Sequence, residues 1–439
     1  MKKIISIALA LLMVAVMLPV MAMADEAPTL QSKIGSANPG DTITLDKDYT
    51  EDITIDKELT IDLNNHKLTN NAGDTITVTV SGNLTITGNG TVDNVTHGKA
   101  ALRIEENGKA TLNGGYFNRS KENGQSGTEP GGNSFYTLIN HGELTINDGA
   151  VVTTASESST LGRYSSLVEN GYQSHNGSTN YPTLTIKGGT FKGGLNTIKN
   201  DDNGITNIYG GKCENYFQAC VQNHHIATIY NGEFSADVSS AWSVLNCGSC
   251  SSVDETHDAH KLVIKNGNFK GNVRANVGSV QIKGGSFEAS FTEENENIGI
   301  SGGTFNTNVT NFASRTGSNV VGYGNNYYVG DDAAAIVENA QSGTITVENV
   351  GENNSFTVKP GVTVQNNWTD NIKVNGKDVY PRETYTVPGA PIIIYTPTED
   401  TSKADNQKNP GTGANDFVGV AAAMAVVSLL GAAAVIRKK

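Results

Sequence analysis

A short motif, with one aliphatic residue before a glycine-containing turn pair and usually phenylalanine after it, returns eight times and limits the fold more than any other feature. The second residue of the pair is glycine in every copy, and successive copies lie 34, 40, 22, 21, 35, 18 and 18 residues apart. A unit near 20 residues with occasional insertions is typical of a solenoid. The copies are TLNGGYF (Thr111 to Phe117), TINDGAV (Thr145 to Val151), TIKGGTF (Thr185 to Phe191), NIYGGKC (Asn207 to Cys213), TIYNGEF (Thr228 to Phe234), VIKNGNF (Val263 to Phe269), QIKGGSF (Gln281 to Phe287) and GISGGTF (Gly299 to Phe305).

Each unit is too short for a helical hairpin, and its apolar positions follow the two-residue period of a β-strand. The glycine in the turn pair allows positive φ, so the chain can turn a corner there without a Cβ clash. The aliphatic residue and the phenylalanine are then predicted to point inward. The composition, with 49 glycines, 11 prolines and 17% charged residues, also favours short strands and tight turns.

A second column lies upstream of the motif, where an apolar residue, a variable residue and asparagine recur. Asparagine tolerates the left-handed conformation, and aligned asparagine side chains can hydrogen-bond from one coil to the next. We therefore expect this column to make the other sharp bend of each coil. The five segments are LIN (Leu138 to Asn140), VEN (Val168 to Asn170), IKN (Ile198 to Asn200), VQN (Val221 to Asn223) and VLN (Val244 to Asn246).

Together the two columns resemble the right-handed parallel β-helix of the pectin-lyase-like fold. PGDTITL (Pro39 to Leu45) and DLNNHKLT (Asp62 to Thr69) are similar to the first coils of that fold in surface proteins of Gram-positive bacteria. The resemblance implies an all-β protein with a parallel β-helix over residues 25–329. A short helix near Leu30 to Ile34 is expected to cover the first open edge.

The chain after the β-helix divides into two parts. DDAAAIVENAQSGTITV (Asp331 to Val347) echoes the N-terminal region, because a helix-like piece precedes a Thr-Ile-Thr strand. We interpret residues 330–395 as a small β-rich cap or a second domain. Residues 396–412 show no apolar period and are predicted to form a flexible stalk.

Both ends of the chain carry export signals. Residues 1–24 combine a Lys2-Lys3 head, an apolar run and a final Ala-Met-Ala, which is typical of a secretory signal peptide. Residues 413–439 form a sorting tail, with a mostly apolar stretch over 417–436 that is long enough for a transmembrane helix. Its basic end, residues 437–439, is expected to stay in the cytoplasm.

The motif before that tail, NPGTG, resembles the LPxTG-like cell-wall sorting signal of Gram-positive surface proteins. The resemblance implies that a sortase cuts between Thr and Gly and joins the protein to peptidoglycan, after the C-terminal helix has held it in the membrane. Asparagine stands where leucine is commonest, which leaves the sortase class open. A plain C-terminal membrane anchor is the alternative, and both place the protein on the outer cell surface. The recognition residues are Asn409, Pro410, Gly411, Thr412 and Gly413.

The charge balance limits the classes of molecule that the protein can bind. With 31 basic and 44 acidic residues the formal net charge is −13. A strongly negative protein is a poor match for nucleic acid or anionic lipid, whose phosphates need basic side chains.

Three long insertions interrupt the repeat, at Asn118 to Ser134, Thr154 to Pro182 and Ser235 to His260. Because each follows the inward phenylalanine position, we expect the loops to gather on one side of the solenoid. Their aromatic residues are candidates for stacking on sugar rings, and the alternative is that the rings pack on the bases of their own loops. These candidates are Tyr164, Tyr172, Tyr181 and Trp242.

One pair of adjacent carboxylates is the candidate for a catalytic cluster. Polysaccharide hydrolases need paired carboxylates, and lyases need Ca²⁺ with a basic residue. Asp201 and Asp202 in NDDNG resemble one element of the polygalacturonase pattern, but no Gly-His-Gly and no Arg-Ile-Lys follow. Both also come directly after Asn200 of the asparagine column, where polar turn residues are common. We therefore assign no catalytic residue and no cofactor.

The four cysteines lie close together in the sequence. Cys213 takes a phenylalanine position and is interpreted as a small core residue. Cys247 and Cys250 form a CxxC near His224, His225, His257 and His260. A local disulfide, free thiols and a Zn²⁺ site all remain open for this CxxC, and we assign no metal.

The leading hypothesis is an anchored β-helical surface protein, an adhesin whose insertion loops bind host glycans, host proteins or other cells. The first alternative is a surface polysaccharide lyase or glycoside hydrolase. The second is a structural spacer of the cell envelope.

Overall fold

The computed structural model describes residues 28–389, apart from 72, 74, 96–98, 121–135, 155–165, 173–178, 237–240, 247–259 and 351–353. The predicted signal peptide, stalk, sorting motif and C-terminal tail lie outside these residues. Within the described ranges, no helix has the length and apolar character that a bilayer crossing requires.

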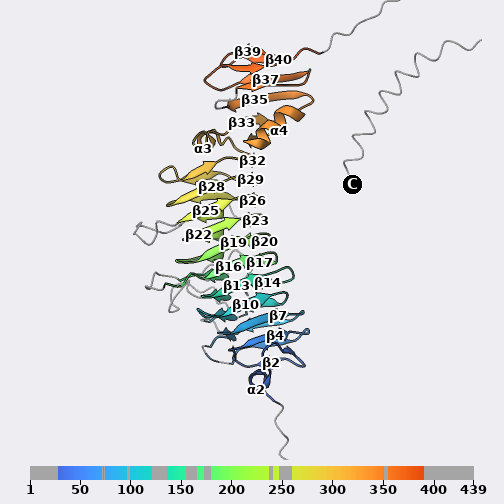
Figure 1. The fold of residues 1–439 in the computed structure, drawn as a ribbon, viewed down its shortest axis with the longest axis vertical. Coiled ribbons are helices and arrows are strands. Elements are labelled where there is room, and N and C mark those ends of the chain that lie inside the picture. Colours follow the sequence, from blue (N-terminus) through green and yellow to red (C-terminus); the bar gives the residue numbers. More distant parts are fainter. Residues whose placement is uncertain are drawn as a thin grey trace, which may run out of the picture. The chain divides into compact units, whose positions relative to one another are not determined.

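Three long sheets run through the structure, and the chain visits them in a fixed order in each coil, except that the last coil has no strand in the third sheet. Figure 1 shows the coils stacked along the long axis of the ribbon. The first, sheet A, holds the strands that end in the aliphatic residue of the motif. Its members are β1 (Thr42–Thr44), β4 (Glu58–Asp62), β7 (Asn83–Thr87), β10 (Lys109–Leu112), β13 (Glu143–Ile146), β16 (Thr183–Ile186), β19 (Ile205–Ile208), β22 (Ile226–Ile229), β25 (Lys261–Ile264), β28 (Ser279–Ile282) and β31 (Ile298–Ile300).

Sheet B follows the glycine turn and holds the phenylalanine column. Its coil strands are β2 (Tyr49–Thr50), β5 (Lys67–Thr69), β8 (Thr91–Asn94), β11 (Tyr116–Arg119), β14 (Val151–Thr153), β17 (Thr190–Lys192), β20 (Lys212–Asn215), β23 (Glu233–Ala236), β26 (Asn268–Lys270), β29 (Ser286–Glu288) and β32 (Gly303–Phe305).

Sheet C closes each coil and holds the asparagine column. Its strands are β3 (Ile53–Ile55), β6 (Val78–Val80), β9 (Leu102–Ile104), β12 (Leu138–Asn140), β15 (Val168–Asn170), β18 (Asn196–Asn200), β21 (Ala219–Asn223), β24 (Trp242–Asn246), β27 (Asn272–Ala275) and β30 (Phe291–Glu293).

Within sheets A and C, and among the coil strands of sheet B, neighbouring strands are parallel, and they are in register apart from a shift between Trp242 and Val244 where β24 pairs with β27, so the protein is a parallel β-helix. Ile186 pairs with Ile208, and Ile208 pairs with Ile229 in the next coil. These three side chains are at most 1% exposed. The aliphatic column therefore fills a continuous interior, as the repeat predicts.

The phenylalanine column stacks in the same interior. The rings of Phe234, Phe269, Phe287 and Phe305 lie nearly parallel, with successive centroids 4.9, 4.6 and 5.0 Å apart. Cys213 takes its place in this column between Phe191 and Phe234. Both the column and the core position of Cys213 are confirmed.

The glycine turns adopt the predicted conformation, since the second glycine of all eight motifs has positive φ. Gly211 shows why no other residue fits easily. Its φ is +101°, and an added Cβ would lie 3.0 Å from the carbonyl oxygen of Gly188 in the preceding coil. A side chain here would therefore strain both the backbone and the stacking of the coils.

The asparagine column forms the predicted amide ladder. From Asn140 through Asn170, Asn200 and Asn223 to Asn246, each Nδ2 donates to the next Oδ1 at 2.7–2.8 Å. The expectation that these residues also take the left-handed conformation is wrong, because none of the five has positive φ. These asparagines lie in strands, and the residues that follow them make the bend. The side-chain amides of the asparagines are therefore available to hydrogen-bond between coils.

Asn200 shows how heavily the buried amides of the ladder are hydrogen-bonded. Its Nδ2 donates to Asn223 and to the carbonyls of Gly204 and Ile226, and its Oδ1 accepts from Asn170 and Thr206. Substitution by alanine would leave several buried groups without partners. We expect a loss of about 2–3 kcal/mol of unfolding free energy, measured by urea titration.

Removal of the exposed amide of Asn147, which hydrogen-bonds only one exposed neighbour, Asn113, provides the control. Equal effects of Asn200→Ala and Asn147→Ala would contradict the assigned role of the ladder.

The predicted N-terminal helix is present as α2 (Leu30–Ser36), and Leu30 and Ile34 enter the main core. The side-chain amide of Gln31 hydrogen-bonds the backbone of the first strand of sheet C, as a neighbouring strand would. Oε1 of Gln31 accepts from the backbone N–H of Thr54 at 2.8 Å, and its Nε2 donates to the carbonyl of Thr54 at 3.3 Å. The open edge is thereby partly satisfied.

At the C-terminal end of the β-helix, sheet B continues into the C-terminal region. The last coil strand, β32, pairs antiparallel with β34 (Asn326–Val329), and sheet B extends through β33 (Val320–Tyr323), β35 (Gly343–Asn349), β37 (Val362–Asn366) and β40 (Thr384–Thr386). Helix α4 (Asp331–Asn339) precedes β35, which matches the predicted echo. The remaining elements are α3 (Thr310–Ser314) and a small sheet of β36 (Ser355–Phe356), β38 (Ile372–Val374) and β39 (Lys377–Val379). A second core runs from Val321 to Val387.

Candidate functional site

Two of the three insertions are not single loops, because each contains a strand. The second contains β15 and the third contains β24, so each of these two divides around a strand of sheet C. The first joins β11 of sheet B to β12 of sheet C. The described ends of the insertions therefore lie directly before or after strands of sheet C, at the passages from sheet B to sheet C and from sheet C to sheet A.

The three aromatic candidates that the structure describes have different surroundings. Tyr172 is buried, its ring stacks on His141 at 4.7 Å, and its hydroxyl donates to Glu106 at 2.9 Å. Trp242 is half-buried, and the guanidinium of Arg274 lies 5.6 Å from its ring centre. Tyr172 thus packs on its own surroundings, which was the alternative to sugar stacking.

Tyr181 remains available for contact. It is 55% exposed, and its ring leans on His225 at 5.8 Å. Tyr164 lies outside the described residues.

Asp201 takes part in a buried polar cluster on the outer side of sheet C. Lys199 Nζ lies 2.9 Å from Asp201 Oδ2 and donates to the Tyr136 hydroxyl at 3.4 Å. Glu169 stands beside Lys199 in the strand register, and only 5% of Glu169 and 3% of Asp201 are exposed. Asp202 is half-buried, and its backbone bridges to Tyr172.

Burial decides the protonation of this cluster. It raises the pKa of Glu169 to about 8, and the nearby Asp201 charge adds to the effect while Lys199 opposes it. Burial also raises the pKa of Asp201, against the pull of Lys199. Two carboxyl groups that are costly to ionise therefore lie near one lysine, which is ion-paired with Asp201, and neither is open to a polymer in this structure.

The cysteine and histidine candidates fall in two groups. Cys247, Cys250 and His257 lie outside the described residues, whereas His224, His225 and His260 are all buried. Among the described residues, no group of three or more histidine, cysteine, aspartate or glutamate side chains is placed to hold a metal ion.

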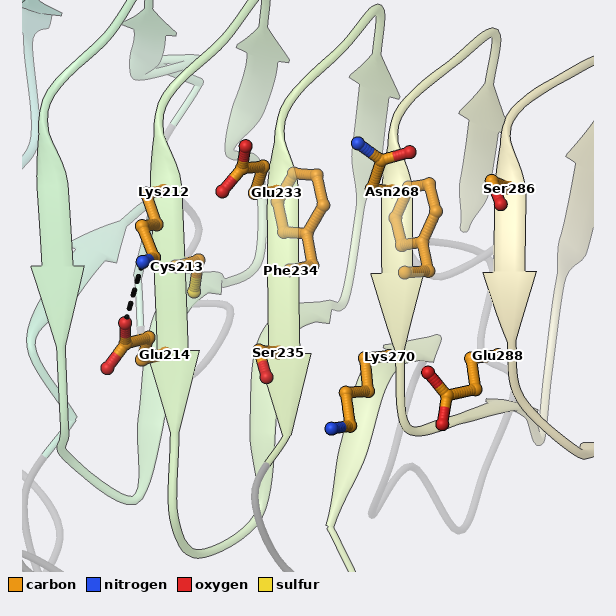
Figure 2. Close-up of a pocket in the computed structure, with 11 residues that line it drawn as sticks. Lys212, Cys213, Glu214, Glu233, Phe234, Ser235, Asn268, Lys270, Ser286 and Glu288 are labelled. Atoms are coloured by element: carbon orange, nitrogen blue, oxygen red, sulfur yellow. Dashed lines mark ion pairs between the residues drawn. The ribbon is translucent and has the colours of Figure 1, made fainter. Parts of the chain in front are cut away.

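An open groove of about 420 Å³ crosses the outer face of sheet B at β20, β23, β26 and β29 (Figure 2). The groove also borders Cys213, Phe234 and Phe269, whose side chains point inward to the core. Charged and polar side chains of both signs rise from the strands, and Lys212 Nζ lies 3.2 Å from Glu214 Oε1. The outward lining residues are Lys212, Glu214, Glu233, Ser235, Asn268, Lys270, Ser286 and Glu288.

A second shallow groove, of about 470 Å³, lies at the corner between sheets A and B. It shares Lys212, Glu233 and Asn268 with the first, so the two surfaces are continuous. Glycines, which have no side chains, make up half of its lining residues. These glycines are Gly189, Gly210, Gly211 and Gly232.

Two tyrosines directly precede the groove residues along the chain. Tyr209 and Tyr230 stack in adjacent coils with ring centroids 4.3 Å apart and an angle of 12°, and Lys265 lies 4.4 Å from the centre of the Tyr230 ring. Tyr209 is 47% exposed. Among the described residues, no further ring or cation stacks on Tyr209.

This tyrosine pair was not among the sequence candidates, although the signal is visible. NIYGGKC and TIYNGEF place tyrosine at the same motif position in successive repeats, so the two side chains must leave the same corner one coil apart. We define the corner groove together with Tyr209 and Tyr230 as the corner strip. It is the described surface that best combines an exposed aromatic ring with hydrogen-bonding groups.

Comparison with known proteins finds no matching family model, no matching curated protein and no matching solved structure. Function therefore has to follow from the chemistry of the residues themselves.

Proposed function

We propose that this chain is a surface-anchored binding protein whose β-helix holds a linear glycan along the corner strip. The observation that supports this most directly is the exposed ring of Tyr209, stacked on Tyr230 beside a glycine-lined groove. A tyrosine ring offers an apolar face to the C–H face of a sugar and a hydroxyl for hydrogen bonding. Ligand sites commonly pair such surfaces with a few placed polar groups.

The repeat explains why a linear ligand fits better than a compact one. Coils stack at the strand spacing of about 4.8 Å, so the same kinds of side chain recur along the axis. The adjoining groove on sheet B continues the polar surface across four strands. A chain molecule can therefore contact several coils at once, whereas a small sugar would meet only one or two.

The charges in the groove favour a glycan of little net charge. Lysine and glutamate alternate there, and Lys212 is already paired with Glu214. A strongly anionic polymer would meet Glu233 and Glu288 as well as Lys270. Neutral or N-acetylated sugars, rich in hydroxyl and amide groups, match this surface better. On a host molecule or another cell, such a glycan would make the protein an adhesin.

The anchoring part of the proposal rests on the terminal segments of the sequence. The signal peptide would export the chain, and a sortase would act on Asn409 to Gly413 and attach it to peptidoglycan of a Gram-positive cell. The C-terminal helix would hold the precursor in the membrane until then. The stalk would then connect the β-helix to the cell wall, with the corner strip displayed outward.

Replacing Tyr209 by alanine is expected to weaken glycan binding by about tenfold, which corresponds to about 1.4 kcal/mol for the lost ring contact. Residues 25–412 would be probed on a glycan array, and the best ligand would then be titrated by calorimetry. Tyr209→Phe should retain most of the binding, because the ring remains.

Two exposed tyrosines elsewhere provide matched controls. Tyr380 is 52% exposed in the C-terminal region, and Tyr380→Ala should leave affinity unchanged. If Tyr181→Ala lost glycan binding while Tyr209→Ala kept it in full, the binding site would lie at the insertions. That result would contradict its assignment to the corner strip. No binding to any glycan would favour a structural spacer instead.

The same preparation also tests polysaccharide cleavage. The burial of Glu169 and Asp201 places the paired carboxyl groups out of reach of a polymer, so we expect no sugar release. Reducing or unsaturated ends released from pectin, glycosaminoglycan or mucin would instead show that the protein is an enzyme.

A further inference from the structure

Two thiols face one another inside the β-helix. Cys213 on β20 and Cys220 on β21 are 2% and 0% exposed, and both are reduced in this structure. The Sγ of Cys213 donates to the carbonyl oxygen of Cys220 at 3.5 Å, and the Sγ of Cys220 donates to the carbonyl oxygen of Cys213 at 3.7 Å. This reciprocal contact points each sulfur at the backbone of the other residue.

A rigid turn holds the pair in one coil. Asn215 closes the turn between β20 and β21, since its Oδ1 accepts from the N–H of Phe217 at 2.8 Å. Its Nδ2 donates to the carbonyls of Gly194 and Leu195 in the preceding coil, at 3.0 and 3.2 Å. The two cysteines therefore approach through fixed local geometry and not through a mobile loop.

We propose that Cys213 and Cys220 form a disulfide when the chain folds in an oxidising environment. In the first step, one thiolate attacks a small disulfide such as oxidised glutathione, forms a mixed disulfide and releases one glutathione thiolate. The second cysteine thiolate then displaces the other glutathione. The protein loses two protons and two electrons, and the oxidant gains them as two thiols.

Burial determines when this exchange can happen. Transfer into the core raises the pKa of the Cys213 thiol well above its usual value, and the neighbouring Cys220 thiol adds to the effect. Since the thiolate is the attacking species, the closed coil reacts slowly. The link is expected to form while the coil is still open, and it is then shielded from reductants. It is independent of glycan binding.

The test compares two samples of residues 25–412, one refolded with oxidised and reduced glutathione and one treated with the same mixture after folding. Both are denatured, alkylated and digested with trypsin and chymotrypsin. Trypsin alone is insufficient, because no lysine or arginine lies between Cys213 and Lys261, so all four cysteines share one tryptic peptide. Chymotryptic cleavage after Phe217 separates the pair, and cleavage after Phe234 removes it from Cys247.

In the refolded sample we expect a cross-linked peptide pair joining Cys213 to Cys220, with loss of alkylation at both. The sample oxidised after folding should keep both residues alkylated. A double Cys247→Ser, Cys250→Ser variant should form the same link, whereas Cys220→Ala should leave Cys213 fully alkylated. If the Cys220→Ala variant fails to fold, the peptide map of the unmodified chain still shows whether Cys213 is linked to Cys220.

Full alkylation of Cys213 and Cys220 in the refolded sample would overturn the proposal. Linkage of either residue to Cys247 or Cys250 would overturn it as well.

Discussion

Substitution of Phe287 by alanine is expected to lower the free energy of unfolding by about 3–5 kcal/mol, the usual cost of removing a buried aromatic ring. Phe287 is 2% exposed and stacks between Phe269 and Phe305, with centroid distances of 4.6 and 5.0 Å. Its loss would open a cavity in the column and remove contacts to the coils on both sides. The midpoint of urea unfolding, followed by circular dichroism, measures the effect.

The loss of stability should depend on whether the substituted side chain points into the core or out to solvent, even within one strand. Ser286 precedes Phe287 and points outward, so Ser286→Ala should change stability by less than about 0.5 kcal/mol. Phe287→Leu should fall between the two, because most of the volume is kept. If Phe287→Ala unfolded at the same urea concentration as the unmodified protein, the coils would not depend on the stacked column.

The second large effect is a fall in stability with rising pH, caused by Glu169. Its pKa is about 8 in the folded protein against an ordinary value of 4.5, so between these values the folded state holds a proton that the unfolded state has released. Protonation therefore stabilises the fold fully below about pH 4.5, and this contribution is lost as pH rises through about 8. Since one pKa unit corresponds to about 1.4 kcal/mol, we expect roughly 2–4 kcal/mol to disappear across this range.

Neutral replacement of the carboxyl group tests the assignment. Glu169→Gln should remove much of the pH dependence of urea unfolding between about pH 5 and 8, because glutamine cannot ionise. Glu143→Gln, at an exposed glutamate paired with Lys109, should leave that dependence unchanged. An unmodified protein equally stable at both ends of this range would show that Glu169 is ionised in the fold.

The repeat made most of the β-helix predictable, because side-chain columns follow from spacing alone. The inward positions of Ile186, Ile208 and Ile229 and the amide ladder through Asn200 could both be inferred from the sequence. That the ladder asparagines avoid the left-handed conformation could not be inferred in this way. Asparagine tolerates that conformation but does not require it, and here the strand hydrogen bonds hold the backbone extended.

The candidate sites were less predictable, because insertions carry no period. Tyr172 and Tyr181 lie in the same insertion, yet one is 6% exposed and the other 55%. Contacts with residues distant in sequence, such as that between Tyr172 and Glu106, decide the difference. Tyr209 could have been found, since its tyrosine neighbour recurs at the same motif position in the next repeat.

The sequence by itself determined the strand period, the glycine corners and the columns that stack, because each follows from local geometry repeated about every 20 residues. Only the tertiary structure decided which outward residues are buried and which thiols meet. Glu169 lies beside Lys199, which is ion-paired with Asp201, and Cys213 faces Cys220, because of how coils align and turn. Burial and long-range proximity depend on the whole packed coil, and no short segment of sequence contains them.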